Sequence, residues 1–545
     1  MTTPASRPDA EDLDGMTAPE LIAHRASTSP DEVFLRDTAG AEMTYADLHL
    51  TALAWARALD RDGVSAGTAV GSMLPNSPEH YAAWLGIAWL HAHEVAINVD
   101  LRGGVLHHVL RSARVEVLVV HVDAVDRVIG LTDDLPDLRH VVVVGADRVE
   151  PDPRWRTSVR DDLLAAAADH PVELVPPAPH DVASVLFTSG TTGPSKGVVV
   201  PWAQLRAGAV PTVRFATRDG EDRFYATGSP SHVVSKGAFS TMALTRGQLV
   251  VRPVFSLTEF WSDVRRFGIR STVLVGAMAD FLLSAGPRPD DADTTLTNVL
   301  MAPVTPRHHE FELRFGTRTW TAYNMTEISV PFASTDWGID DPRSCGRLRT
   351  DFPYYEARLV DEHDHEVPVG EVGELVVRTA VPWTVTPGYL HLPEATAAAW
   401  RNGWFHTGDA FTLDESGRYF FVDRMKDTIR RRGENISSFE VEAEVLQHPA
   451  VAECAAVAVP ADEIEDEIKI VVVETPAGAL DPADLVEFLT DRVPRHMVPR
   501  YVEIVAELPR TQTLRVQKSE LRRATASGHI WDRTAARSPA RGTRA

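Results

Sequence analysis

A run of small and hydroxyl-bearing residues at positions 188–197 carries the clearest chemical signal in the sequence. In order, it contains Thr188, Ser189, Gly190, Thr191, Thr192, Gly193, Pro194, Ser195, Lys196 and Gly197. Its glycines let the backbone approach an anion closely, its hydroxyls add donors, and Lys196 adds a positive charge. It is not a Walker A loop, because Ser195 stands where that loop requires glycine and Gly197 where it requires Ser or Thr. Since it directly follows a strand predicted at Val182–Phe187, we interpret it as a phosphate-holding loop rather than a surface turn.

Four later segments turn this local signal into a family resemblance. They are Tyr323-Asn324-Met325-Thr326-Glu327, Thr407-Gly408-Asp409, Asp423-Arg424-Met425-Lys426-Asp427 and Gly433-Glu434-Asn435-Ile436-Ser437. Together with residues 188–197, and in the same order, they make the chain resemble the adenylate-forming superfamily of acyl-CoA synthetases, luciferases and peptide-synthetase adenylation domains. The resemblance extends over roughly residues 17–525, and the last segment is most similar to carnitine/crotonobetaine-type acyl-CoA ligases.

The resemblance implies nucleotide-binding roles for most of these residues. Tyr323 would pack near adenine, and Thr326 would touch the α-phosphate. Glu327 would help to bind Mg²⁺, a hard cation that prefers oxygen ligands. Asp409 would accept hydrogen bonds from the ribose hydroxyls, and Arg424 would contact the ribose. The full set expected to bind ATP is Thr188, Ser189, Gly190, Thr191, Thr192, Gly193, Lys196, Ala302, Pro303, Tyr323, Asn324, Met325, Thr326, Asp409 and Arg424.

The C-terminal part of the chain departs from the superfamily at a catalytic position. Most members end with Pro-Arg-Thr-x-x-Gly-Lys, whose lysine holds the carboxylate and the α-phosphate, whereas here Leu514 and Arg515 occupy the last two positions. Arginine keeps the positive charge, but its planar fork is larger and geometrically more demanding than an ammonium group. A shift of register would instead make Lys518 the catalytic residue. The catalytic set that we predict is Arg515, Lys196, Thr326, Glu327 and His232.

A second departure lies in the segment Ser229–Gly237. Members of the superfamily usually place an aromatic residue or a histidine here, beside the acyl group, and His232 fits that role. Lys236 is unexpected, and two interpretations are open: it faces an unusually polar or anionic substrate, or it extends to solvent. By the same resemblance, Gly276 forms part of the wall of the acyl pocket.

The resemblance implies an ATP-dependent, AMP-forming ligase that adenylates a small acid and then passes the acyl group on, with CoA as a possible second substrate. One alternative is a diazotase of specialised metabolism, which adenylates nitrite and delivers it to an aryl amine. The two atypical cations, Arg515 and Lys236, motivate this alternative. Another alternative is a nucleotide-binding homologue weakened by the loss of its lysine, although the intact residues 188–197, Thr326, Glu327 and Asp409 argue against it.

The composition excludes several other classes of protein. An apolar share of 44% and a charged share of 24% are ordinary for a globular chain. The 54 Lys and Arg residues against 77 Asp and Glu give a net charge of −23, which disfavours nucleic acid and anionic membranes as partners. Cys345 and Cys454 lack the spacing of metal ligands, so we expect reduced thiols. Because residues 1–15 lack an apolar signal region and the apolar stretch Tyr81–Ile97 is interrupted by polar side chains, we expect a cytoplasmic protein without membrane spans.

Alternating helical and strand-like segments must position the candidate residues. We predict a helix at Tyr81–Leu90 and strands at Val117–Val120, Val141–Val144, Thr272–Val275 and Glu374–Arg378, an alternation typical of βαβ units around parallel sheets. After Asp423 the sequence predicts a smaller unit, whose elements are a helix at Ser438–His448, strands at Ala452–Val459 and Lys469–Glu474, and a helix at Pro482–Arg492.

The fold class that follows is α/β, with a large N-terminal domain of βαβ-type sheets plus a small β-barrel-like part, and a small mobile α+β C-terminal domain. We expect a flexible N-terminus at residues 1–16 and a large ATP- and substrate-binding domain at 17–423. The small domain is expected at 424–530, followed by a disordered tail at 531–545. By resemblance, Lys426 is the hinge about which the small domain rotates.

Overall fold

The structure is a computed structural model of the chain. The residues that it describes are 15–131, 134–188, 195–216, 221–425, 429–431, 434–436, 438–460, 466–476, 480–490, 492–493, 495, 497–510, 516–523 and 530–536.

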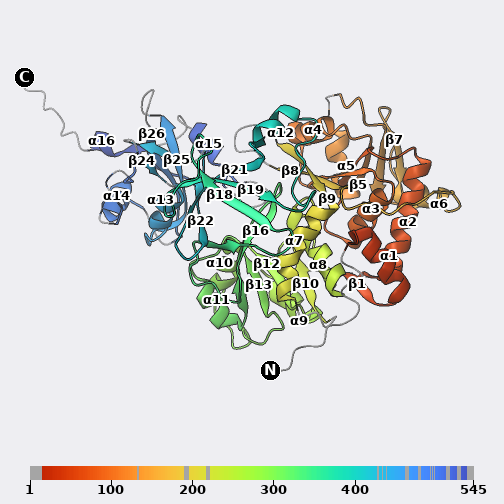
Figure 1. Ribbon diagram of the computed structural model, residues 1–545, viewed down its shortest axis with the longest axis horizontal. Helices are drawn as coiled ribbons and strands as arrows, with labels where there is room; N and C mark the ends of the chain where they lie inside the picture. Colours follow the sequence, from red (N-terminus) through yellow and green to blue (C-terminus); the bar gives the residue numbers. More distant parts are fainter. Residues whose placement is uncertain are drawn as a thin grey trace, which may run out of the picture.

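One parallel sheet is formed by strands from the first 201 residues, in the order β7-β6-β5-β3-β4-β8-β9 (Figure 1). Its strands are β3 (Ala69–Met73), β4 (His93–Ala96), β5 (Val117–His121), β6 (His140–Val144), β7 (Arg156–Val159), β8 (Val182–Thr188) and β9 (Lys196–Pro201). All pairs are parallel except β8 with β9, which form an antiparallel hairpin. Because helices cover both faces, strands such as β5 are nearly continuous apolar runs.

A second sheet has the order β14-β13-β12-β10-β11-β1-β2, and all its pairs are parallel except β1 with β2. Its strands are β1 (Val33–Asp37), β2 (Glu42–Thr44), β10 (Arg223–Ala226), β11 (Gln248–Val251), β12 (Ser271–Leu274), β13 (Asn298–Met301) and β14 (Arg318–Trp320). The chain leaves β10 first to one side, toward β11, and then to the other, toward β12. A crevice at the carboxyl ends of the strands is expected where the order reverses in this way.

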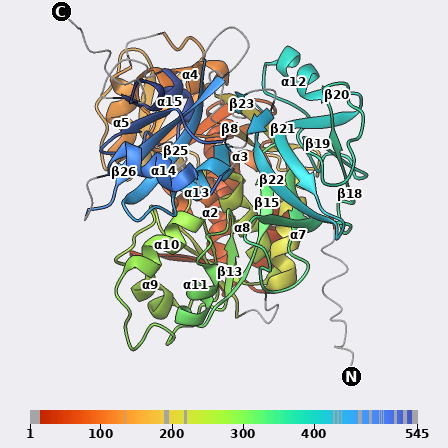
Figure 2. The ribbon, with the colours of Figure 1, turned by 90° about the vertical axis from the view of Figure 1, so that its left-hand side faces the viewer.

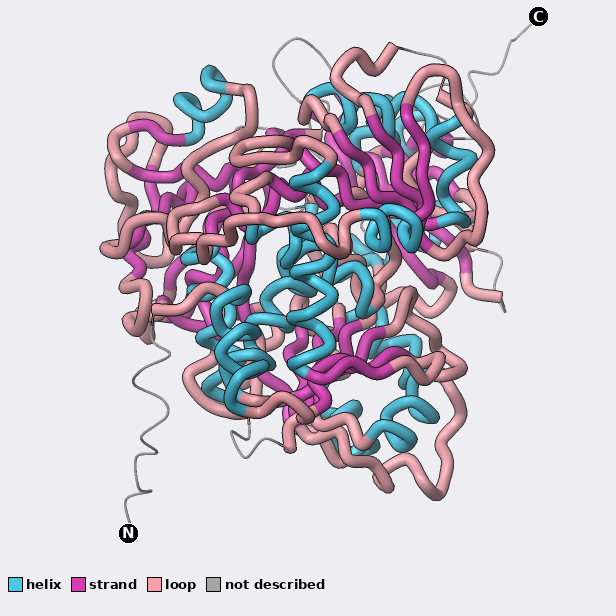
Figure 3. The backbone as a smooth tube through the Cα atoms, turned by 90° about the vertical axis from the view of Figure 1, so that its right-hand side faces the viewer, coloured by secondary structure: helices cyan, strands magenta, loops and turns pink. Residues whose placement is uncertain are grey.

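Helices lie between and around these two sheets. They are α1 (Ala18–Thr28), α2 (Tyr45–Arg61), α3 (Pro78–Trp89), α4 (Gly103–Ser112), α5 (Val122–Ile129), α6 (Arg160–Ala166), α7 (Trp202–Phe215), α8 (Val233–Thr245), α9 (Phe260–Phe267), α10 (Gly276–Ser284) and α11 (His308–Phe315). Figure 3 shows a group of helices in the middle of the molecule, with strands above and below them.

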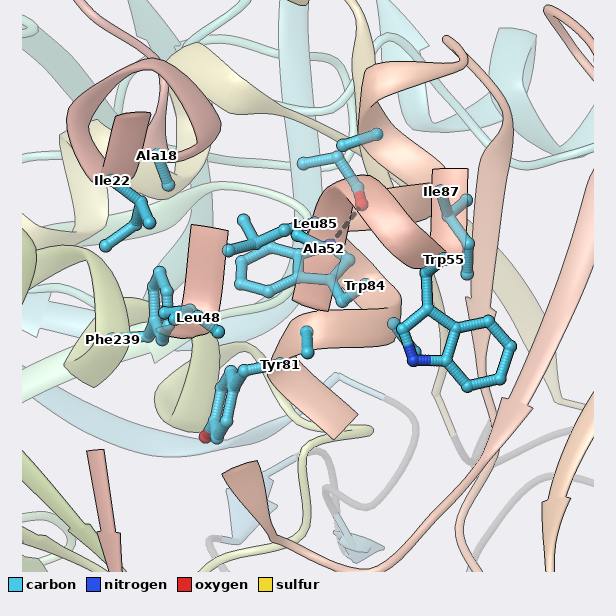
Figure 4. Packing of buried hydrophobic residues seen from close by; sticks show 14 of the residues in the cluster. Ala18, Ile22, Leu48, Ala52, Trp55, Tyr81, Trp84, Leu85, Ile87 and Phe239 are labelled. Atoms are coloured by element: carbon cyan, nitrogen blue, oxygen red, sulfur yellow. Dashed lines mark hydrogen bonds between the residues drawn. The ribbon is translucent and has the colours of Figure 1, made fainter. Parts of the chain in front are cut away.

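The central core joins α1, α2, α3 and α8. In Figure 4, Tyr81, Trp84 and Leu85 of α3 lie among residues of α1 and α2 and beside Phe239 of α8. The rings of Tyr81 and Phe239 stack with their centroids 4.9 Å apart. Helix α3 is buried along almost its whole length, so the apolar stretch around Tyr81 packs inside the protein. In the described part of the chain, no helix has the length and apolar character needed to cross a membrane.

The predicted β-barrel-like part corresponds to an antiparallel sheet with the strand order β15-β16-β17-β22-β21-β19-β18, to which β20 adds on β21. Its elements are β15 (Ala322–Met325), β16 (Ser329–Ala333), β17 (Ser344–Leu348), β18 (Tyr355–Val360), β19 (Gly373–Thr379), α12 (Pro393–Ala399), β20 (Trp400–Arg401), β21 (Trp404–Leu413) and β22 (Arg418–Arg424). An aromatic cluster that includes Phe332, Phe411 and Tyr419 fills one side of this sheet.

The smaller C-terminal unit lies at one end of the molecule, coloured blue in Figures 1 and 2, and has its own hydrophobic core. Its elements are β23 (Ile429–Arg431), β24 (Glu434–Ile436), α13 (Ser438–Val445), β25 (Val451–Pro460), β26 (Asp466–Glu474), α14 (Pro482–Thr490), β27 (Tyr501–Ile504), α15 (Lys518–Arg523), β28 (Ile530–Asp532) and α16 (Arg533–Ala536). The helices and strands that we predicted from the sequence are all present, with ends that differ by a few residues. The large α/β part and the smaller α+β unit confirm the predicted fold class.

The disordered tail predicted from residue 531 begins too early. Residues Ile530–Asp532 form β28, which pairs with β27, and Arg533–Ala536 form α16. An ion pair between Arg500 and Asp532, with an N–O distance of 3.2 Å, fixes this segment, and Trp531 packs against the core of the small unit. The composition alone missed these contacts because they depend on partners about thirty residues away.

Candidate active site

The carboxyl ends of neighbouring strands bring several predicted residues to one edge of the second parallel sheet. His232 follows β10, Gly276 follows β12, Ala302 and Pro303 follow β13, and Tyr323 follows β14. Since β14, β13, β12 and β10 are adjacent and parallel, residues that follow their carboxyl ends share one side of the sheet. This is the side on which open α/β sheets bind ligands.

At Gly276 the backbones of two loops at this edge of the sheet come close together. A Cβ atom at this position would come within 3.1 Å of both the carbonyl oxygen of Pro303 and the backbone nitrogen of Thr305. The backbone N–H of Gly276 also donates to the carbonyl oxygen of Pro303 at 2.9 Å. The loop after β12 and the loop after β13 therefore touch through their backbones, which favours glycine here.

Strands β8 and β9 flank the loop that we predicted to hold phosphate. Thr188, the last residue of β8, pairs directly with Lys196, the first residue of β9. The ammonium group of Lys196 lies 4.7 Å from the ring centroid of Tyr389. Five loop residues with predicted roles, Ser189, Gly190, Thr191, Thr192 and Gly193, lie outside the described residues, so their roles stay predictions.

Tyr389 is a functional candidate that the sequence did not reveal. The segment Thr386–Leu390 runs beside β9, with backbone hydrogen bonds from Leu390 to Gly197 (2.8 Å) and from Val199 to Gly388 (3.1 Å). The hydroxyl of Tyr389 donates to Glu327 Oε1 at 3.0 Å. The side chain of Tyr389 thus contacts both Lys196 of the β8–β9 hairpin and Glu327, the predicted metal ligand. A lone Gly-Tyr pair is too short a pattern to have marked it.

Glu327 is a buried carboxylate, with 4% of its surface exposed. Burial raises its pKa, while the hydroxyl of Tyr389 and the charge of Arg424 act in the opposite direction. Its backbone is held by Thr386, whose N–H donates to the carbonyl of Glu327 at 2.7 Å, and the preceding carbonyl, of Thr326, accepts from Gln204 Nε2 at 2.7 Å. A carboxylate whose charge is costly to bury fits a divalent cation, which would favour the ionised form.

Metal ligands beyond Glu327 would have to come mainly from a nucleotide. Among the residues that the structure describes, no group of three or more His, Cys, Asp or Glu side chains forms a metal-binding cluster. A cation held by one carboxylate and by substrate phosphates is the usual arrangement for Mg²⁺. The residues present therefore fit Mg²⁺ bound together with ATP.

The antiparallel sheet brings Tyr323, Asp409 and Arg424 together from strands β15, β21 and β22. The hydroxyl of Tyr323 donates to Asp409 Oδ2, and Arg424 Nε lies 2.7 Å from Asp409 Oδ1 in an ion pair. Asp409 and Arg424 are cross-strand partners in the β21–β22 pairing. Burial and then the charge of Asp409 raise the pKa of Tyr323 well above its usual value, so the phenol stays a donor. Residues separated by up to 101 positions in the sequence thus form one polar group.

The remaining residues of the Tyr323–Glu327 segment occupy the end of β15 and the turn after it. Asn324 is exposed, and Met325 is half-buried against the aromatic cluster of the antiparallel sheet. The structure therefore gives different environments to the residues of this segment, with Glu327 buried and Asn324 open to solvent.

His232 immediately precedes α8, and its backbone N–H donates to the carbonyl of Ser229. Burial lowers the pKa of its imidazole, which favours the neutral form. A neutral histidine at the N-terminus of α8 is compatible with the predicted position beside the acyl group.

Lys236 does not extend to solvent, so that expectation is wrong. Its side chain is fully buried and its ammonium group lies 2.6 Å from Glu94 Oε2 and 3.9 Å from the ring centroid of Trp84. Ser184 donates to the same oxygen of Glu94 at 2.6 Å. Because α8 packs inside the protein, Lys236 reaches strand β4, and its charge is matched by Glu94 rather than left for an anionic substrate.

The predicted hinge residue, Lys426, and the predicted catalytic residue Arg515 lie outside the described residues. Lys518, the alternative to Arg515, is engaged within the small unit. Its ammonium group lies 2.8 Å from Glu442 Oε1 and donates to Ser438 Oγ. This arrangement gives Lys518 a structural partner of opposite charge, so Arg515 stays the predicted catalytic residue.

Comparison with known proteins covers almost the whole chain. Residues 22–390 match the family model of the AMP-binding enzymes, and residues 440–514 match the model of the AMP-binding enzyme C-terminal domain. The chain is 30% identical over 491 residues to the crotonobetaine/carnitine–CoA ligase of Citrobacter koseri, a match that covers 88% of this chain and 93% of that protein. For the ligase of the same name from Salmonella paratyphi C, the identity is 32% over 469 residues, with coverages of 84% and 89%.

Solved structures share the fold at lower identity. The anthranilate CoA ligase AuaEII in complex with anthranoyl-AMP superimposes with a TM-score of 0.81 at 24% identity, over 95% of this chain and 98% of that one. The amide bond synthetase McbA from Marinactinospora thermotolerans gives a TM-score of 0.76 at 24% identity, over 93% of this chain and 100% of that one.

Proposed function

Because this chain belongs to the AMP-binding enzyme family, we propose that it is an ATP-dependent, AMP-forming ligase that adenylates a small carboxylic acid and transfers the acyl group to CoA. The observation that supports this most directly is the grouping of Glu327, Lys196 and Tyr389 beside the phosphate hairpin, with Asp409 nearby on the antiparallel sheet. A nucleotide needs cations for its phosphates and a carboxylate for its ribose hydroxyls, and this grouping supplies both kinds of group.

In the first half-reaction, a carboxylate oxygen of the acid attacks the α-phosphorus of ATP, an acyl adenylate forms, and pyrophosphate leaves. Lys196 and the loop 188–194 would hold the phosphates, and Thr326 would donate to the α-phosphate. Asp409 and Arg424 would fix the ribose. Mg²⁺, held by Glu327 together with phosphate oxygens, would neutralise negative charge on the phosphates. Arg515 would complete the set as the cation that joins the acid and the α-phosphate.

In the second half-reaction, the thiol of CoA attacks the acyl carbon and AMP leaves. We propose that the small unit, residues 424–530, rotates about Lys426 relative to residues 17–423 so that the thiol can enter, a motion confined to a few hinge residues. The choice of CoA is supported by the relatives at 30% and 32% identity, whose names state CoA ligase activity.

The diazotase alternative rested on two atypical cations. One of them, Lys236, is paired with Glu94 in the core, so only Arg515 still supports nitrite as the activated acid. The carboxylic acid is therefore the better-supported substrate class.

The test is a screen of ATP-dependent pyrophosphate release with each candidate acid and acceptor. We expect release with one or a few small carboxylic acids, and AMP and an acyl-CoA as the other products. Release that depends on nitrite and an aryl amine, with none from any carboxylic acid, would establish the diazotase instead. Binding of AMP without pyrophosphate release from any acid would identify a nucleotide-binding homologue without ligase activity.

Replacing Tyr389 with Phe should raise the Mg²⁺ concentration needed for half-maximal pyrophosphate release about 10-fold. The substitution keeps the ring beneath Lys196 but removes the hydroxyl that orients Glu327, and a hydrogen bond to a charged group contributes about 1.5–3 kcal/mol. The measurement is a Mg²⁺ titration of activity at saturating ATP.

Tyr355→Phe is the matched control for this titration. The buried hydroxyl of Tyr355 donates to the carbonyl of Ile328 at 2.9 Å, next to Glu327 in sequence, and has no contact with its carboxylate. We expect the control to need the same Mg²⁺ concentration as the wild type. Equal Mg²⁺ curves for all three proteins would show that Tyr389 does not position the metal ligand.

A further inference from the structure

A pocket of about 470 Å³ adjoins the phosphate hairpin and has no role in the proposed reaction. It lies between helix α4, the stem of the hairpin and the segment around Leu390. A volume of this size is within the range of pockets that bind small ligands.

The hairpin separates this pocket from the predicted catalytic phosphate site. Phe187, Ser195 and Gly197 line the pocket, whereas Thr188 and Lys196 alternate with them along β8 and β9. Successive residues of a strand point to opposite faces of the sheet. The pocket therefore lies on the face opposite to Lys196 and the ring of Tyr389, which makes it a second site.

The ionisable side chains that line the pocket are all cationic or basic. They are His107, His108, Arg111, Arg114 and His391, and within the described residues no Asp or Glu side chain contributes to the lining. The chain as a whole has a net charge of −23 and repels anions, but a concave site lined by these residues attracts them locally.

The hydrogen bonds of these side chains go to neutral acceptors. Rings of His107 and His108 bond to the carbonyl oxygens of Asp134 (3.1 Å) and Ser195 (2.9 Å), and the guanidinium of Arg111 also donates to Asp134 O at 3.0 Å. A backbone carbonyl orients a cationic donor but does not cancel its charge. Three of the five side chains are thus held in place, and the positive charge of Arg111 is not cancelled by its carbonyl acceptor.

Arg114 and His391 both line the pocket. In the part of the chain that the structure describes, neither side chain has a hydrogen-bond or ion-pair partner within bonding distance. Burial and the positive charge of Arg114 lower the pKa of His391, and Asp137 opposes this more weakly. The guanidinium of Arg114 beside a neutral imidazole, with no carboxylate at bonding distance, leaves N–H donors free to bind an anion.

We propose that this pocket binds an anion with a diphosphate group, such as inorganic pyrophosphate, separately from the catalytic site. Arg111 and Arg114 supply forked donors that match two neighbouring phosphate groups, and the histidines add further donors. Because His108 bonds to Ser195, the residue before Lys196, an occupant would contact the stem that carries the phosphate-holding loop.

The test is a calorimetric titration of inorganic pyrophosphate into the full chain carrying Lys196→Gln, with no ATP or acid present, so that the catalytic phosphate site is weakened and no nucleotide phosphate competes for the pocket. This protein, the background for the variants below, should still bind pyrophosphate. The double variant Arg114→Gln with His391→Gln should bind it at least about 10-fold more weakly, since each lost contact is a charge-assisted one. Both residues are exposed, so the variant should fold, and its thermal transition checks this.

Arg148→Gln is the matched control. It also removes one surface charge, but Arg148 does not line the pocket and pairs with Glu150 on an open surface. ADP is titrated in parallel. Tighter binding of pyrophosphate than of ADP would indicate a free diphosphate as the ligand, and tighter binding of ADP would indicate the diphosphate end of a larger metabolite; either result supports the site. Unchanged pyrophosphate binding in the double variant, or equal binding of sulfate, would overturn the proposal. Because binding rather than turnover is measured, its failure is distinct from a failure of the ligase assay.

Discussion

Replacement of Asp409 with Asn should lower kcat/KM for ATP by about 100-fold. Asp409 is almost fully buried, receives the hydroxyl of Tyr323 and forms an ion pair with Arg424. Asparagine keeps the shape but loses the charge, so the ion pair to Arg424 and the proposed charge-assisted bonds to ribose are lost together. Two such bonds at about 1.5–3 kcal/mol each, partly compensated by the amide oxygen, correspond to a loss of this size. Pyrophosphate release measured over a range of ATP concentrations gives the value.

The β21–β22 hairpin offers a control for this substitution. Asp414 also accepts from an arginine, with Arg418 Nε at 2.9 Å from its Oδ2, but on the surface and away from Tyr323. Asp414→Asn should leave kcat/KM for ATP unchanged, since exposed ion pairs contribute about 0–1 kcal/mol. If Asp409→Asn also retained full kcat/KM, the proposed ribose contact would be wrong.

Replacement of Lys236 with Met should lower the free energy of unfolding by about 3–5 kcal/mol, because it leaves Glu94 as an unpaired charge in the core. The pair is fully enclosed, with both side chains at 0% exposure and an N–O distance of 2.6 Å. Ser184 donates to Glu94, and His80 Nε2 lies 3.5 Å from Glu94 Oε1, but burial lowers the pKa of His80 and favours the neutral ring, so neither residue replaces the lost cation. Urea unfolding followed by tryptophan fluorescence suits this measurement, since the ammonium group of Lys236 lies 3.9 Å from the ring centroid of Trp84.

Adding Glu94→Gln to Lys236→Met should recover much of this loss. Glutamine keeps an oxygen that accepts from Ser184 but carries no charge, so the double variant has no unpaired ion in the core. Equal unfolding free energies for the single and double variants would show that the charge of Glu94 is not the source of the instability. A Lys236→Met variant as stable as the wild type would show that the pair contributes nothing.

The architecture followed from local features of the sequence. Apolar runs such as Val117–Val120 predicted buried parallel strands, because a strand covered on both faces must be apolar along its whole length. The order of the motifs, from residues 188–197 to Asp409, then predicted the family to which the chain belongs. Each of these signals lies within about ten consecutive residues, a length over which residue type alone fixes the conformation or the chemistry.

The pairing of side chains across the fold followed only from the tertiary structure. Glu327 meets Tyr389 over a separation of 62 residues, and Lys236 meets Glu94 over 142. Lys236 looked available for an anionic substrate because nothing within its own segment neutralises it. Its partner is the carboxylate of Glu94, which lies on strand β4.

The sequence by itself thus determined the two-part α/β fold and the family, and it predicted a phosphate-holding loop between β8 and β9. Only the tertiary structure decided that Tyr389 joins Lys196 to Glu327, that Lys236 belongs to the core, and that basic residues of α4 and His391 share one pocket. The physical reason is that charge compensation depends on distance in space, and packing places groups within 3 Å of each other that the sequence separates by more than a hundred residues.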